Sequence, residues 1–315
     1  MQKNNTFLGI DIGGTAAKIG LVNSDGEILE MDSFSVSFDG YQTPIIETVV
    51  KNTDAFLKRL GISEKTLSGI GVSATGQINV LEGTVAGSAG HIANWLGTPV
   101  KTILEEHYHL PVAVANDANC AVMGEQWKGA ARDSHNVIMI TVGTGVGGGI
   151  IVQDQLLSGS VGIAGELGHF TVQKDGIPCT CGNRGCYERY ASTTALVRRV
   201  KETSDFPSDV VIDGRYIFRQ AAEGNQKILC ILEEWIQDIA VGLVGLIHIF
   251  NPETVIIGGG VSQQEELFIR PLKEKILEKI MPCFRENLHI CAAELGNNAG
   301  LLGAVAFLMQ CENLK

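Results

Sequence analysis

The feature that most constrains the fold is a strand, glycine turn, strand pattern that occurs twice. The first copy reads TFLGIDI, GGT, AAKIGLV over residues 6–22, and the second reads NVIMITV, GTGVGGG, IIVQDQLL over residues 136–157. Apolar runs bounded by glycines are typical of strands joined by tight turns. The first copy continues through NSDG into a third strand, and the second into a stretch that ends in HFTV, so we expect a β-meander at each place.

Helical and strand patterns follow each meander. The run IIETVVKNTDAFLKRLG predicts an amphipathic helix, LSGIGVSATG a buried strand, and LPVAVANDAN a strand that leads into a helix. In the second half, helices over 225–249 and 264–280 flank the strand ETVIIGGG. This alternation indicates two α/β lobes, over residues 1–118 and 119–298, and the helical pattern over 299–315 can pack on either.

Charge and hydropathy restrict the partners. The chain has 315 residues, 45% of them hydrophobic, and a formal net charge of −11. This charge argues against nucleic acid and anionic membranes as main partners, because phosphates are bound by clustered Lys and Arg. The N-terminus lacks the apolar region of a signal peptide, and the apolar run IAVGLVGLIHIFN after Asp238 is too short to span a bilayer. We expect a cytoplasmic protein that binds small molecules.

Three of the eight cysteines form a cluster with a histidine. His169 is followed by Cys179, Cys181 and Cys186, whereas the other five cysteines are scattered singly among apolar neighbours. Three thiolates and one imidazole are a complete tetrahedral Zn²⁺ ligand set, and a site with four protein ligands is structural. A disulfide knot would leave one of the three cysteines unpaired. The alternative to zinc is a group of loose thiols.

The two glycine turns have the composition of phosphate cradles. In the first, Asp11 ends an apolar strand, Gly13 and Gly14 allow backbone N–H groups to approach an anion, and Thr15 adds a hydroxyl. A carboxylate beside a phosphate suits a role with Mg²⁺. The second turn offers Thr144 with Gly145; its GxGxxG spelling is not a dinucleotide fingerprint, because a strand and not a helix follows. Two such turns, one per lobe, can bind one polyphosphate from both sides. The alternative for each turn taken alone is that it only reverses the chain and binds nothing.

A third glycine stretch and a polar motif complete the candidates. The stretch IIGGGVS ends a strand at Gly259, where a flat ligand can lie against the backbone, or where the chain only turns into a helix. In VAVANDAN, Asn116 and Asp117 end an apolar strand where a helix begins. Asp117 is therefore a candidate general base with Asn116 orienting the substrate, and the alternative is a helix N-cap. Glu166 and Glu188 flank the cysteine cluster.

Together these motifs resemble the ROK family of bacterial sugar kinases, within the actin-like, hexokinase-like ATPase superfamily. DIGGT, NDAN, TVGTGVGGG, GELGH, CTCGNRGCYE and IIGGG occur in the family order over nearly the whole chain, and the cysteine signature is the most specific of them. The resemblance implies an α/β fold of two actin-like (RNase H-like) lobes with an active-site cleft between them. It also implies a structural zinc loop over 169–188 and a homodimer.

The resemblance assigns roles to residues. It implies that Asp117 is the base that activates the C6 hydroxyl of a hexose, and that His169 uses one ring nitrogen for Zn²⁺ and the other for the sugar. The implied sugar contacts are Gly76, Asn116, Asp117, Glu166, His169 and Glu188. The implied contacts to ATP and Mg²⁺ are Asp11, Gly13, Gly14, Thr15, Lys18, Thr144, Gly145 and Gly259.

The sequence departs from the family pattern around the sugar. Asn79 in GQIN stands where the family often has an acid, and either His91 or Asn94 can align with a family Asn in the next loop. Ala16 follows DIGGT where a polar residue is frequent. The expected function is that of an ATP-dependent hexose kinase acting on glucose or a relative, with N-acetylmannosamine, fructose and β-glucosides as alternatives. A non-catalytic sugar-sensing regulator is the alternative from another class; ROK repressors carry an N-terminal DNA-binding domain, for which a core starting at residue 7 leaves no room.

Overall fold

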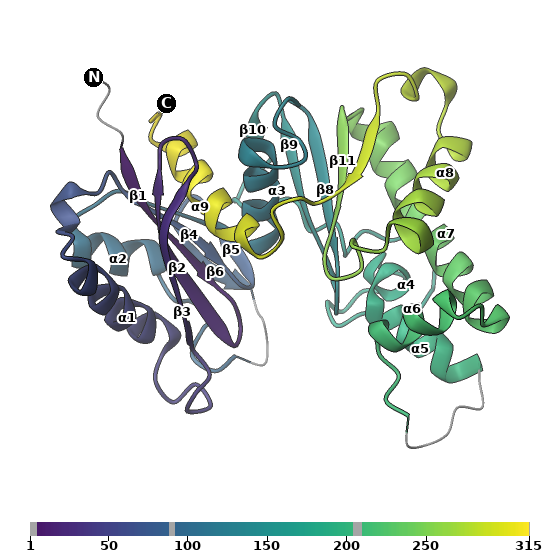
Figure 1. Cartoon of the computed structure of the whole chain (residues 1–315), viewed down its shortest axis with the longest axis horizontal. Helices are drawn as coiled ribbons and strands as arrows, with labels where there is room; N and C mark the ends of the chain where they lie inside the picture. The colour runs from purple at the N-terminus through teal and green to yellow at the C-terminus, as the bar shows by residue number, and fades with distance from the viewer. Residues whose placement is uncertain (1–4, 88–91, 204–209, 315) are drawn as a thin grey trace. The chain divides into compact units, whose positions relative to one another are not determined.

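The computed structural model describes residues 5–87, 92–203 and 210–314 (Figure 1). His91, one of the two candidates for the sugar loop, lies outside the described residues. Within this part of the chain, two five-stranded sheets and a small hairpin carry the fold. The hairpin pairs β5 Gln77–Asn79 with β6 Thr84–Gly87. The predicted α/β fold class is confirmed.

The first sheet has the strand order β3-β2-β1-β4-β7. Strands β1, β2 and β3 form the predicted antiparallel meander, and β4 and β7 extend it in parallel to β1. Their bounds are β1 Thr6–Ile12, β2 Ala16–Asn23, β3 Ile28–Ser35, β4 Ile70–Ala74 and β7 Val112–Asn116. The carboxyl ends of β1, β4 and β7 therefore meet at one edge of the sheet.

The second sheet repeats this arrangement in the order β10-β9-β8-β11-β12. Strand β10 is antiparallel to β9, and β11 is parallel to both β8 and β12. The bounds are β8 Val137–Val142, β9 Val146–Val152, β10 Gln155–Leu156, β11 Thr254–Gly258 and β12 His289–Ala292. The equal strand orders confirm the duplication that the two glycine turns indicate.

The second meander differs in detail from the prediction. The run IIVQDQLL is not one strand, because Gln153 and Asp154 have positive φ and turn the chain between β9 and the short β10. The HFTV stretch is not a regular strand either; Thr171 makes only an isolated bridge to Cys186. The stretch begins with His169, which belongs to the cysteine cluster. The loop that contains it is therefore organised around that cluster and not by strand pairing.

The described helices include five at predicted positions and four that the sequence patterns did not predict. They are α1 Ile45–Leu60, α2 Val100–Tyr108, α3 Asp117–Lys128, α4 Glu188–Ala191, α5 Thr193–Thr203, α6 Gly214–Ala222, α7 Gln226–Phe250, α8 Arg270–Lys279 and α9 Ala299–Cys311. The helix predicted over 264–280 is in two parts, a π-helical turn Glu265–Ile269 and then α8. Short 3-10 turns occupy Glu64–Thr66, Pro282–Phe284 and Gly296–Asn298. No helix within the described ranges combines the length and apolar character needed to cross a membrane.

The chain divides into two compact units. Unit 1 comprises residues 1–133, 149–165 and 295–315, and unit 2 comprises 134–148 and 166–294. Unit 1 thus extends beyond the expected boundary near residues 118–120, because α3 packs against α9 and both stay with the first sheet. The C-terminal helix belongs to this unit.

Helix α9 approaches the first sheet and α3 very closely (yellow in Figure 1). A Cβ atom on Gly71 of β4 would lie 2.2 Å from the backbone oxygen of Ala304, and one on Gly303 would lie 1.6 Å from that of Cys120. Glycine at these positions lets the backbones touch. The same packing brings the first turn of α9 to the edge of the sheet where β1 ends.

Candidate active site and metal cluster

Asp11 lies near the end of β1 and is held from three sides. Its Oδ1 atom accepts a hydrogen bond of 2.7 Å from the hydroxyl of Ser73, which is fully buried on the neighbouring strand β4. Its Oδ2 atom lies 3.3 Å from the ammonium group of Lys18. A Cβ atom on Gly300, in the first turn of α9, would lie 2.8 Å from Oδ1. The carboxylate is therefore fixed in position at the sheet edge.

The first glycine turn joins β1 to β2 beside Asp11. The N–H of Gly13 donates to the carbonyl of Ala16 at 2.9 Å, and Tyr41 donates its hydroxyl to the carbonyl of Gly14 at 2.7 Å. Thr15 is exposed, and its carbonyl accepts the N–H of Val36. The peptide groups of the turn are thus oriented by contacts on one side.

Lys18 makes a contact that the sequence does not indicate. Its ammonium group donates to the backbone oxygen of Asn297 at 2.7 Å, in addition to its pairing with Asp11. Asn297 lies in the 3-10 turn that precedes α9. Lys18 therefore ties β2 to the segment that returns to unit 1.

Asn116 and Asp117 stand where β7 becomes α3. The side-chain oxygen of Asn116 accepts the N–H of Asn119 at 2.7 Å, so Asn116 is the N-cap, and Asp117 is the first residue of the helix with an exposed side chain. The Oδ1 atom of Asp117 accepts the N–H of Ala118 at 2.8 Å. Helix capping, the alternative explanation for Asp117, is therefore the role of its neighbour. In the β4–β7 register Asn116 pairs with Ala74, two residues before Gly76, so these residues share one sheet edge.

Two turn residues, Gly76 and Asn79, and one buried residue, Cys120, follow β4 and β7 in the sequence. Gly76 follows β4 with a φ of 100°, a conformation that favours glycine. Asn79, which replaces a family acid, accepts the N–H groups of Leu81 and Glu82 and so closes the turn between β5 and β6. The thiol of Cys120 is fully buried below; burial first, and then the charge of Asp11, raise its pKa above the ordinary value, which keeps it neutral.

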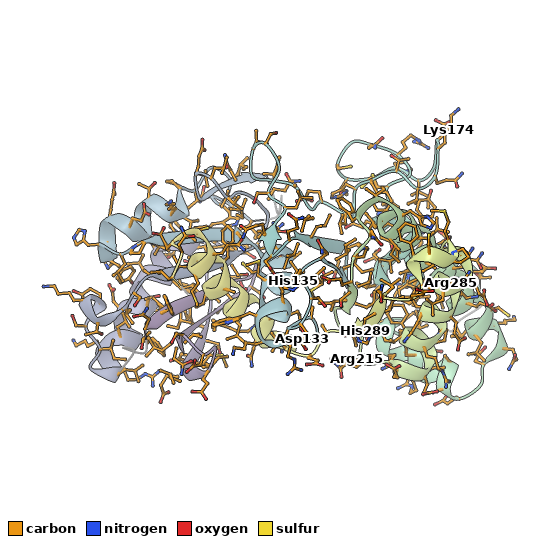
Figure 2. All side chains as sticks on the ribbon, turned by 90° about the horizontal axis from the view of Figure 1, so that it is seen from above. Asp133, His135, Lys174, Arg215, Arg285 and His289 are labelled. Carbon is orange, nitrogen blue, oxygen red and sulfur yellow. The ribbon has the colours of Figure 1, made fainter. Side chains whose placement is uncertain are left out.

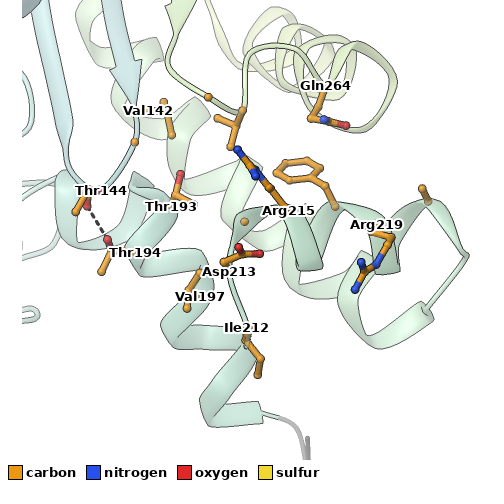
Figure 3. Close-up of a pocket in the computed structure, with 16 residues that line it drawn as sticks. Val142, Thr144, Thr193, Thr194, Val197, Ile212, Asp213, Arg215, Arg219 and Gln264 are labelled. Atoms are coloured by element: carbon orange, nitrogen blue, oxygen red, sulfur yellow. Dashed lines mark hydrogen bonds between the residues drawn. The ribbon is translucent and has the colours of Figure 1, made fainter. Parts of the chain in front are cut away.

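The second glycine turn joins β8 to β9 in unit 2, and its contacts come from the segment after the cysteines. The Oε2 atom of Glu188 accepts the N–H of Val146 at 3.0 Å, and a Cβ atom on Gly145 would lie 2.3 Å from that oxygen. The hydroxyl of Thr194 donates to the carbonyl of Thr144 at 2.7 Å, drawn as a dashed line in Figure 3. Glu188, which the resemblance places at the sugar, thus also supports this turn.

A cavity of about 750 Å³ opens beside the second turn (Figure 3). The backbone of Gly143 and Thr144, the start of α5, helix α6 and the loop after β11 line it, with Asp213, Arg215, Arg219 and Gln264 among the polar side chains. Its volume suits a drug-sized or nucleoside-sized ligand. Gly259 has a φ of 92°, and a Cβ atom there would lie 2.1 Å from the carbonyl of Val142. Gly259 therefore shapes the wall of the cavity; its neighbours Gly260 and Val261 line it.

The predicted metal ligands come together. One ligand atom each from His169, Cys179, Cys181 and Cys186 lies within 4.8 Å of all the others. Nδ1 of His169 is 3.6 Å from Sγ of Cys179, and the Sγ atoms of Cys181 and Cys186 are 3.6 Å apart, too far for a disulfide. Tetrahedral zinc with ordinary bond lengths requires separations of about 3.6 Å for N to S and about 3.8 Å for S to S. The four residues therefore fit a zinc ion.

The loop that carries this cluster projects from unit 2, with Lys174 at its end (Figure 2). Burial raises the pKa of the Cys186 thiol to about 12, whereas a hydrogen bond from the N–H of Asn183 lowers the pKa of Cys181. Glu166 precedes the cluster, and its carbonyl accepts the N–H of His169 at 3.0 Å.

The structure therefore gathers the candidates into two groups. Asp11, Gly13, Gly14, Thr15, Lys18, Gly76, Asn116 and Asp117 lie in unit 1, and Thr144, Gly145, Glu166, His169, Glu188, Gly259 and the three clustered cysteines lie in unit 2. Sequence reasoning missed Ser73 and Thr194. A serine inside the buried strand IGVSA was a usable signal for the first, and Thr194 gave none.

Comparison with known proteins decides the family. The model of the ROK family matches residues 7–311. The chain belongs to the ROK family. It is 34% identical to a glucokinase of Thermotoga maritima, over 96% of this chain and 97% of that protein. A crystal structure of a ROK glucokinase from Streptomyces griseus, in complex with glucose and AMPPNP, superimposes with a TM-score of 0.77 at 34% identity, covering 95% of this chain and 98% of that one.

The ROK family also includes proteins of another class. A xylose repressor of Caldicellulosiruptor bescii is 30% identical over 96% of this chain and 78% of the repressor. Membership of the ROK family thus agrees with the sequence motifs but does not by itself separate kinase from regulator. The side chains of the site must make that distinction.

Proposed function

We propose that this ROK protein is an ATP-dependent hexose kinase that transfers the γ-phosphoryl group to the 6-hydroxyl of glucose or a related hexose. The observation that carries the proposal is the β7–α3 junction, where Asn116 caps the helix and Asp117 presents an exposed carboxylate at the same sheet edge as Asp11. The 34% identity to glucokinases and the retention of both glycine turns support it.

In the proposed reaction, Asp117 accepts the proton of the sugar hydroxyl as the hydroxyl oxygen attacks the γ-phosphorus of ATP. The bond from that phosphorus to the bridging oxygen of ADP breaks, and the side-chain NH₂ group of Asn116 orients the sugar. Glu166, His169 and Glu188 would bind ring hydroxyls, and Gly76 would line the sugar pocket. The backbone N–H groups of the two glycine turns would bind the phosphates, and the cavity beside Thr144 would hold the nucleoside.

Magnesium would supply charge neutralisation on the phosphates. Asp11 is the residue of unit 1 that we assign to it, because its carboxylate is held in place by Ser73 and Lys18 at the end of a strand. Thr15 and Lys18 complete this part of the phosphate site. A homodimer and a cytoplasmic location remain part of the proposal.

Zinc would occupy the cluster of His169, Cys179, Cys181 and Cys186 in a structural role. Four protein ligands leave no open position for a substrate or water, so the ion would order the loop and not take part in bond breaking. Protein purified without added zinc should contain about one zinc per chain by metal analysis. Metal-free protein with full activity would contradict this assignment.

A sugar-sensing regulator is the second candidate, because the xylose repressor matches over 96% of this chain. Such a protein would bind a sugar without turning over ATP. The presence of Asp117, Asp11 and both turns favours the kinase.

The deciding experiment is ADP release measured with ATP and a panel of hexoses, comprising glucose, N-acetylmannosamine, fructose and a β-glucoside, with a control that lacks sugar. The proposal predicts sugar-dependent ADP release for at least one hexose and a phosphate monoester at its C6 by NMR. Binding of a sugar without phosphorylation of any would favour the regulator. A second run with inorganic polyphosphate in place of ATP tests the phosphoryl donor.

A further inference from the structure

Residues 186–194 connect the metal cluster to the second glycine turn. This stretch, called the bracket below, begins at Cys186, a metal ligand, continues through α4 and ends at the start of α5. It lies in unit 2 together with the turn. Only seven residues separate the metal ligand from the last contact to the turn, Thr194.

The bracket makes three hydrogen bonds to the turn. Glu188 accepts the N–H of Val146 at 3.0 Å, the N–H of Thr193 donates to the carbonyl of Gly143 at 2.9 Å, and the hydroxyl of Thr194 donates to the carbonyl of Thr144 at 2.7 Å. These bonds define the orientation of consecutive peptide groups. The turn's ability to present N–H groups to an anion depends on that orientation.

The bracket is itself anchored in the core. Tyr187 is fully buried and donates its hydroxyl to the carbonyl of Ile239 at 2.7 Å. The indole N–H of Trp235 donates to the carbonyl of Ser192 at 3.1 Å. A buried aromatic anchor on each side of Glu188 makes the stretch stiff.

The other end of the bracket is tied to the segment of His169. The N–H groups of Tyr187 and Glu188 donate to the carbonyls of Phe170 and Gly168, both at 2.9 Å. His169 and Cys186 are thus ligands on two adjacent, hydrogen-bonded segments. A metal ion that joins them fixes the bracket at its origin.

We propose that the metal cluster preorganises the nucleotide site as well as the sugar site. The bracket connects the cluster to the second phosphate turn, and Thr194 is a positioning residue for that turn. This rests on the proposed kinase function. Thr194 lines the cavity that we assign to the nucleoside, and we infer that its hydroxyl acts on the turn through the carbonyl of Thr144.

The first test compares T194V, which keeps the shape but loses the hydroxyl, with T194S, which keeps the hydroxyl. ADP affinity is measured by calorimetry on the zinc-loaded protein, together with KM for the sugar. Loss of one hydrogen bond predicts an ADP dissociation constant raised about threefold to tenfold in T194V and nearly unchanged in T194S, with the sugar KM unchanged in both. Equal ADP affinity in wild type and T194V, or equal losses in both variants, would overturn the proposal.

The second test uses C181S, because Cys181 is exposed and its replacement leaves the core intact. ADP affinity is followed while zinc is removed and returned, with circular dichroism as the control for folding. We expect ADP affinity to fall with zinc loss and to recover with excess zinc. Loss of sugar affinity with unchanged ADP affinity would refute the connection, and if C181S unfolds, the T194V and T194S pair decides. Wild-type protein that binds no ADP would instead defeat the proposed function.

Discussion

The two glycine turns occupy the same topological place, yet each has a different support. The first follows β1, which carries its own carboxylate, Asp11, two residues before the turn. The second follows β8, where the equivalent position is Thr141, and its carboxylate, Glu188, arrives from a segment beyond the cysteine cluster. The two copies of the framework therefore differ in which part of the chain supplies the carboxylate beside the turn. The first turn is supported from within its own sheet, whereas the second is held by the bracket, which we propose is fixed by a metal ion.

Among the residues around the two turns, the largest effect should come from Asp11, the carboxylate of the first turn. Replacing Asp11 by Asn keeps the size of the side chain but removes the charge assigned to Mg²⁺, so kcat should fall by about a hundredfold or more. Steady-state kinetics at saturating ATP and varied Mg²⁺ measures this. S73A, which removes the hydroxyl that bonds Asp11 and also contacts the thiol of Cys120, should act more weakly and mainly raise the Mg²⁺ concentration needed for half-maximal rate. A D11N enzyme with near-normal kcat would contradict the difference in carboxylate support that we describe for the two turns.

A matched pair of glycine substitutions displaces one carboxylate at a time. The Cβ atom of G300A would press on Oδ1 of Asp11, and that of G145A on Oε2 of Glu188. Asp11 is short and held from three sides, whereas Glu188 is longer and can move, so we expect about a tenfold loss of kcat for G300A and a smaller change, mainly in KM, for G145A. Kinetics for both substrates distinguishes them. G245A, where a Cβ meets no atom within 4 Å, is the control and should be neutral. The reverse ranking would contradict the account.

The smallest effect should come from Lys18. Its ammonium group is partly exposed, and an ion pair of this kind contributes less than about 1 kcal/mol to stability. K18M should therefore shift the thermal midpoint only slightly, and raise KM for ATP by a few fold at most. Calorimetry measures the thermal midpoint, and steady-state kinetics measures KM for ATP. A loss of kcat as large as that of D11N would contradict this ranking, because it would make Lys18 as important to the phosphoryl transfer as Asp11.

The framework was predictable because its information is local. Apolar runs, glycine turns and polar strand ends follow one another within each repeat, so the first meander, the pair β8 and β9, α1, α7 and the junction at Asn116 could be predicted from short stretches of sequence. The metal cluster was also accessible, since its four ligands lie within 18 residues of sequence. Asp117 stood out for the same reason, at the end of an apolar strand.

The remaining features depend on contacts between distant segments. The cavity beside Thr144 is assembled from loops and helices between residues 142 and 264, and no single segment has a distinctive pattern. The split of IIVQDQLL arose because Gln153 and Asp154 adopt positive φ, which the alternation of apolar residues does not encode. The contact of Glu188 with Val146 spans 42 residues and appears only when α4 is placed.

The most direct test of the kinase assignment is the substitution of Asp117 by Asn, measured by turnover and by sugar binding in the same preparation. The account predicts that D117N loses nearly all kcat, about a hundredfold or more, because the proton of the hydroxyl has no acceptor, while calorimetry shows sugar affinity close to that of wild type. A D117N protein that keeps most of its kcat would contradict the account.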